Sequence, residues 1–147
     1  TSRQMPDFGE YLRGSGAVTP SLLVRVVATG NIELFITLIA SLSGRSERRV
    51  AGIVGAGKSP ALRALVIDCG LKEGLASLFG EAVSLWRAIA RGDKALRPAA
   101  VPALILGRVS AAGSSGGIPH DALTLLRRLA GEAERDAVRS AAGAIAA

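Results

Sequence analysis

The sequence is short of the residues that build most catalytic and metal sites. It contains one cysteine, Cys69, and one histidine, His120, in 147 residues. A single cysteine cannot form an internal disulfide, which fits a reducing cytoplasm. The two residues together offer too few ligands for a structural zinc site. Because no close pair among the twelve acidic residues suggests acid/base chemistry, we expect no enzymatic activity, no metal and no cofactor.

Aromatic residues and long apolar runs are also scarce. Aromatics make up 3% of the chain, whereas hydrophobic residues make up 49%. The core must therefore consist of Leu, Val, Ile and Ala, which favours closely packed helices over an aromatic-rich β-sandwich. No apolar run approaches the roughly 20 residues that span a bilayer, and no stretch resembles a signal peptide. We expect a cytoplasmic protein without membrane association, and because the chain begins at Thr1 we expect it to belong to a longer protein.

What the sequence has in quantity is short apolar segments that end in glycine. Each of four segments begins with a Thr, Asn or Ser that can cap a helix, and each closes with Gly. Pro20 and Pro60 stand at the first helical position of two of them. The apolar residues recur at three- and four-residue steps, as on one face of a helix. The four predicted helices lie within residues 19–30, 31–44, 46–55 and 59–70.

Longer helices are predicted in the second half, at residues 73–91, around Pro102, and from Pro119 into the 140s, with an exposed loop at 112–117. The apolar spacing of the last helix predicts a buried stripe of Leu123, Leu126, Ala130, Ala133 and Ala137. The first four helices form two pairs that recur after about 26 residues. Since so short a pair cannot bury its apolar face alone, stacking of neighbours is expected. The sequence therefore predicts an all-α fold, a HEAT- or armadillo-like stack of antiparallel helix pairs, with an arm at 1–17 and one domain at 18–147.

Residues 52–59 read GIVGAGKS, the spacing of a phosphate-binding P-loop. A P-loop needs an apolar strand before it, but Arg48 and Arg49 occupy that position. Pro60 has no N–H to offer a phosphate. Asp68 follows Ser59 by only nine residues, which is too few for a parallel crossover to a magnesium-holding strand. We predict a turn between two helices here and rank nucleotide binding third among the functions considered.

Positive charge is concentrated in two segments. The net charge is +6, from 15 Arg and three Lys against twelve acidic residues, and residues 45–63 and 87–108 carry +4 each around an acidic stretch of −2. Solvated helix flanks are the simpler interpretation. If the fold joins the two segments, they form an anion-binding face. The candidate residues for binding an anion or a partner are Arg45, Arg48, Arg49, Lys58 and Arg63.

The run LLVRVVATGNIELFITLIASLSGRSERRVAGIVGAGKSPALRALVIDCGL resembles an uncharacterised bacterial family of all-helical proteins, found mainly in alpha-proteobacteria. The shared pattern is a Leu-rich helix, a Gly–Asn turn, a helix with Phe, a small SG turn, a Val-bearing helix and a helix ending in GL. It covers roughly residues 19–90, and the tail LLRRLAGEAERDAVR is also similar. The resemblance implies a HEAT-like helical stack and assigns no catalytic residue.

Taken together, these features predict a non-enzymatic interaction module. We expect it to bind a protein partner through a surface of adjacent helices, with arginines making bidentate contacts to acidic groups. The alternative is a module that binds the phosphate backbone of nucleic acid. Single-stranded nucleic acid is a poor match, because no aromatic residues are interleaved with the basic ones. The sequence assigns no oligomeric state.

Overall fold

A computed structural model describes residues 18–57, 59–113 and 117–146, and within them every regular element is helical. The all-α prediction is therefore confirmed. The predicted arm at 1–17 and Lys58 lie outside the described residues. The elements are α2 (Pro20–Ala28), α3 (Ile32–Ser43), α4 (Glu47–Gly55), α5 (Pro60–Asp68), α6 (Leu75–Ala90), the 3₁₀ turn η1 (Pro98–Ala100), α7 (Val101–Ala111) and α8 (His120–Ala146).

The first four helices begin where the capping residues predict. In each of them the cap side-chain oxygen accepts the backbone N–H three residues later, at 3.1–3.2 Å. Such a cap stabilises a helix by about 1 kcal/mol. The caps of α2, α3, α4 and α5 are Thr19, Asn31, Ser46 and Ser59.

The terminal glycine was predicted correctly for three of these helices and incorrectly for the fourth. Gly30, Gly44 and Gly70 follow α2, α3 and α5 with positive φ. For α4 the sequence favoured Gly55 as the stop, but Gly55 is still helical and the left-handed residue is Gly57, at φ 80°. Two glycines two residues apart gave the chain two possible stops, and the later one is used.

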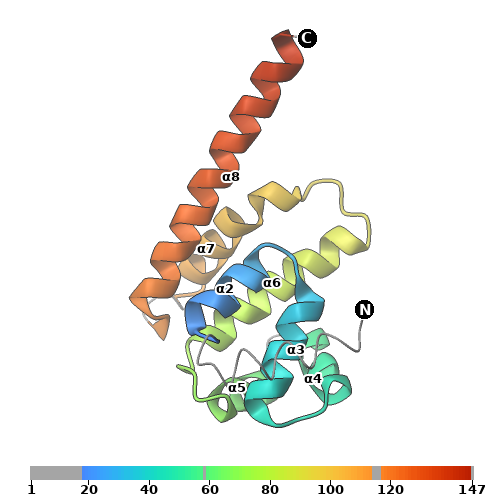
Figure 1. The fold of residues 1–147 in the computed structure, drawn as a ribbon, viewed down its shortest axis with the longest axis vertical. Coiled ribbons are helices and arrows are strands. Elements are labelled where there is room, and N and C mark those ends of the chain that lie inside the picture. The colour runs from blue at the N-terminus through green and yellow to red at the C-terminus, as the bar shows by residue number, and fades with distance from the viewer. Residues whose placement is uncertain (1–17, 58, 114–116, 147) are drawn as a thin grey trace.

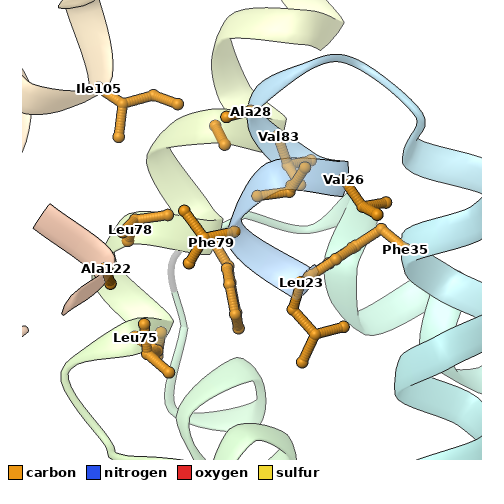
Figure 2. Packing of buried hydrophobic residues seen from close by; sticks show 14 of the residues in the cluster. Leu23, Val26, Ala28, Phe35, Leu75, Leu78, Phe79, Val83, Ile105 and Ala122 are labelled. Carbon is orange, nitrogen blue, oxygen red and sulfur yellow. The ribbon is translucent and has the colours of Figure 1, made fainter. Parts of the chain in front are cut away.

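The core lies where α2 and α6 meet the surrounding helices. α2 packs against α3, α6, α7 and α8. Figure 2 shows Phe35 of α3 and Phe79 of α6 in this core, with ring centroids 4.9 Å apart in an edge-to-face arrangement. Trp86 of α6 donates its indole N–H to the carbonyl of Val27 at 2.9 Å, which ties α6 to the last turn of α2. Aliphatic side chains fill most of the remainder, as the composition predicted.

The last helix leaves the body of the molecule. Figure 1 shows α8 packed beside α7 in its first half and extending beyond the other helices in its second half. Leu126 is fully buried, whereas Val138 is 64% exposed. The sequence pattern predicted Ala137 on the buried stripe, and this is wrong: Ala137 is exposed and lines a hollow that Trp86 of α6 and Pro98 of η1 also line.

Candidate functional site

Helix α4 turns one side to the core and the opposite side to solvent. Val50 and Val54 are buried, and the carboxylate of Glu47 accepts the hydroxyl of Thr37 of α3 at 2.6 Å. Since successive residues are about 100° apart around a helix, Arg48 and Arg49 fall on the outer side. Both are exposed, and neither makes an ion pair with a described residue.

Two other candidate arginines are engaged within the molecule. Arg45, just before α4, forms a hydrogen-bonded ion pair with Asp68 at the end of α5. This contact joins residues 23 positions apart and holds the α4–α5 pair together at one end. Arg63 of α5 lies 3.6 Å from the carboxylate of Glu73, with both side chains more than half exposed. An exposed pair of this kind contributes about 0–1 kcal/mol.

Arg63 also lies at a groove of about 720 Å³ between the first turns of α5 and α6. Its lining is largely apolar or small, including Leu62 and Ala76. Most of its polar groups already have partners, because Arg63 is paired with Glu73 and Ser59 caps α5. Lys72 and Ser77 also line the groove, and the buried hydroxyl of Ser77 has no hydrogen-bond partner among the described residues.

Arg87 of α6 was not among the candidate residues, yet it reaches α4. Its Nη1 donates to the carbonyl of Gly55 in the last turn of α4. Gly55 follows Arg48 by seven residues, which is close to two full turns, so both lie on the same side of α4. The charge count had marked residues 87–108 as basic, but only the fold shows which of them meets the first basic segment. Arg108 of the same segment instead pairs with Glu81 at 3.8 Å.

The stretch that resembles a P-loop has the predicted helix–turn–helix structure. Arg48 to Gly55 are helical, and Gly57 turns the chain with a positive φ. The hydroxyl of Ser59 accepts the N–H of Leu62, so it is occupied as a helix cap. Asp68 lies at the other end of the helix that Pro60 opens. The described residues thus lack the strand that would hold a phosphate loop open.

The single cysteine and the single histidine are not part of the outer side of α4. Cys69 is half-buried and its thiol points to the carbonyl of Ile39, with 3.7 Å between sulfur and oxygen. Burial, and secondly the charge of Asp68, raise the pKa of Cys69 to about 11. His120 is exposed at the start of α8. Among the residues described, no group of three or more His, Cys, Asp or Glu could hold a metal ion.

The comparison with protein families covers most of the chain. The family described as "Uncharacterised protein conserved in bacteria (DUF2336)" matches residues 2–115. The chain belongs to this family. The DUF2336 match includes α2 to α7 and ends before α8 begins at His120. No curated protein and no solved structure matches the chain.

Membership in DUF2336 confirms the resemblance to an uncharacterised bacterial family, and the family's description names no activity. The outer side of α4 and Arg87 lie within the matched residues, whereas the exposed half of α8 lies outside them. No described helix is both long enough and apolar enough to cross a membrane.

Proposed function

We propose that this DUF2336 member is a non-enzymatic interaction module that binds a protein partner through the outer side of α4. One observation carries the proposal: Arg48 and Arg49 are exposed without an ion pair among the described residues, whereas Arg45 and Arg63 of the same segment are paired internally. No ion pair between described residues has to be broken before Arg48 and Arg49 can engage a partner.

Arginine suits such a role for physical reasons. Its planar guanidinium offers five N–H donors and binds a carboxylate through two parallel hydrogen bonds. It is also enriched among the residues that dominate binding energy in protein interfaces. Because both arginines are anchored on one rigid helix, their backbone loses little conformational entropy on binding.

The proposal includes a HEAT-like stack in a cytoplasmic, alpha-proteobacterial protein. Contacts of α3 with both α4 and α5, and of α2 with α3, support stacking of the pairs α2/α3 and α4/α5. The single half-buried cysteine supports a reducing compartment. In a stack of this kind, neighbouring helices together form an extended surface for a partner.

A second candidate function is binding to the phosphate backbone of nucleic acid. The contact between Arg87 and Gly55 favours it, because this contact brings the two basic segments together. Against it, Arg45, Arg63 and Arg108 are engaged with carboxylates. Strong backbone binding typically neutralises about 6–10 phosphates, so a protein partner is the better fit.

The test is capture of a partner by the immobilised chain from nuclease-treated bacterial lysate, with charge reversal at two sites. Arg48→Glu with Arg49→Glu should abolish capture. The matched control is Arg127→Glu with Arg128→Glu, since these are also adjacent and exposed arginines, on α8. Equal capture by both variants, or equal loss, would contradict the assignment of the site.

Nucleic-acid binding is measured separately with duplex DNA. The proposal predicts weak binding to duplex that Arg48→Glu with Arg49→Glu hardly changes. Tight binding that drops by orders of magnitude between about 50 and 200 mM salt, and that the same variant abolishes, would establish the second candidate in place of the first.

A further inference from the structure

The outer side of α4 has cationic groups at both of its ends. Arg48 lies in the first turn, and Arg87 reaches the last turn, where its Nη1 donates to the carbonyl of Gly55. Seven residues of α-helix rise about 10 Å and return to nearly the same side. The α-carbons of Arg48 and Gly55 therefore mark two points about 10 Å apart along one side of α4.

The surface of α4 between these two points has small residues and no carboxylate. Ala51 and Gly52 are exposed, and a β-carbon added at Gly52 or Gly55 would lie in open space, with no neighbouring atom within 4 Å. Residues 48–56 contain no carboxylate. A second helix can approach such a surface closely, because no large side chain stands between the two cationic ends.

Arg87 is held in place for this use. With Nη1 on the Gly55 carbonyl, the rest of the guanidinium has no partner among the described residues. An arginine anchored by one hydrogen bond loses less freedom when it forms the next. Arg91, the exposed residue that follows α6, stands about one turn after Arg87.

We infer that the partner segment is an acidic α-helix that lies along α4 and carries carboxylates about two turns apart, one facing Arg48 and one facing Arg87. This inference rests on the proposed function. The register of α4 carries it: Arg48 and Gly55, whose carbonyl binds Arg87, are seven positions apart on one side of α4, and two residues seven positions apart on a partner helix share a side with the same backbone rise of about 10 Å. Packed helices approach to about 8–10 Å between axes, a distance that the exposed Ala51 and Gly52 permit.

A duplex nucleic acid suits this surface less well. Among the residues that the structure describes, the α4 face and the end of α6 supply four cationic side chains, Arg48, Arg49, Arg87 and Arg91. These are fewer than the roughly 6–10 phosphate contacts of a strongly salt-dependent site. A helix with two carboxylates needs no more cations than these.

The experiment uses two alanine-based helical peptides of identical composition and charge. In one, two glutamates stand seven residues apart and share a side of the helix. In the other they stand nine apart and face opposite sides. Each is titrated at low salt into the isotopically labelled chain, and the backbone amide signals of Gly52 and Gly55 are followed by NMR. Duplex DNA is titrated in a separate sample.

The inference predicts that the seven-residue peptide shifts the signals of Gly52 and Gly55 and binds about fivefold more tightly than its isomer. Arg48→Gln and Arg87→Gln should each weaken it about two- to fivefold, as expected for the loss of one exposed ion pair. Arg127→Gln on α8 should leave it unchanged. Equal binding of the two peptides, shifts confined to other helices, or tighter binding of duplex than of either peptide would each overturn the inference.

The two proposals fail in different ways. If capture from lysate depends on Arg48 and Arg49, but the peptides bind equally and Arg87→Gln has no effect, the function stands and the acidic helix is wrong. If capture does not depend on Arg48 and Arg49, the proposed function fails first, and the acidic helix fails with it.

Discussion

Substituting Gly74 by alanine tests a close backbone approach between the start of α6 and the chain before α8. Gly74 precedes α6 with a φ of −60°, which any residue adopts without strain. A β-carbon there would lie 1.7 Å from the carbonyl oxygen of Gly117 and 2.2 Å from its carbonyl carbon. Ordinary contacts between carbon and oxygen are about 3.3 Å or longer, so the backbone before α8 must move away from α6 by more than 1 Å, roughly.

The loss of stability can be estimated from the cost of overpacking, because the added β-carbon would overlap the backbone carbonyl of Gly117. Overpacking costs about 1–3 kcal/mol and sometimes more, and a peptide group between two helices cannot rotate aside as a side chain can. We expect Gly74→Ala to lower the free energy of unfolding by about 3 kcal/mol, at the upper end of that range. At about 2–4 °C per kcal/mol for a chain of this size, its Tm should fall by about 6–12 °C.

Gly44→Ala is the matched control, because the cause of its cost is different. Gly44 has a φ of 74°, but a β-carbon there would meet nothing within 4 Å. Its cost is backbone strain alone, about 1–2 kcal/mol. Urea and thermal unfolding followed by circular dichroism would measure both variants. The reasoning is refuted if Gly74→Ala is as stable as the parent chain, or if Gly44→Ala loses more stability than Gly74→Ala.

Three further predictions concern other parts of the molecule. Trp86→Phe removes the hydrogen bond to the carbonyl of Val27 and should lower the free energy of unfolding by about 1 kcal/mol, measured in urea; an unchanged midpoint would contradict it. Because burial and Asp68 raise the pKa of Cys69 from 9.0 to about 11, its alkylation by iodoacetamide at pH 8 should be about 100-fold slower than that of an ordinary thiol. The rate should keep rising with pH until about 11, as mass spectrometry would show, and fast alkylation at pH 8 would mean that the thiol is not buried. Calorimetric titration with ATP and magnesium should give no binding heat for the parent or for Lys58→Ala, whereas heat that this substitution abolishes would contradict the turn between α4 and α5.

Local signals in the sequence were enough to place the first four helices. A capping side chain, a proline in the first turn and a terminal glycine act over a few residues, so Ser59, Pro60 and Gly70 alone bound α5 closely. The same signals failed where they were ambiguous, as at Gly55 and Gly57. The same signals argued correctly against a P-loop, because Ser59 caps α5 and Pro60 is its first residue.

Contacts between distant residues could not be predicted in this way. The sequence named Arg45 and Arg48 as equal candidates, but only the fold brings Asp68 to Arg45 and leaves Arg48 without an ion pair among the residues that the structure describes. Likewise Arg87 meets Gly55 across 32 positions, and no periodicity encodes that distance. Ala137 continues the apolar spacing of α8 but is exposed, because spacing along one helix does not determine how closely other helices pack against it.

The central claim is that the outer side of α4 is the surface that a partner covers. Arginine footprinting tests it most directly: the chain is treated with phenylglyoxal, free and in complex with the captured partner, and modification of each arginine is quantified by mass spectrometry. We predict that Arg48 and Arg49 are protected in the complex while Arg127 and Arg128 are modified at the same rate as in the free chain. Unchanged modification of Arg48 and Arg49, with protection of Arg127 and Arg128 instead, would contradict the account.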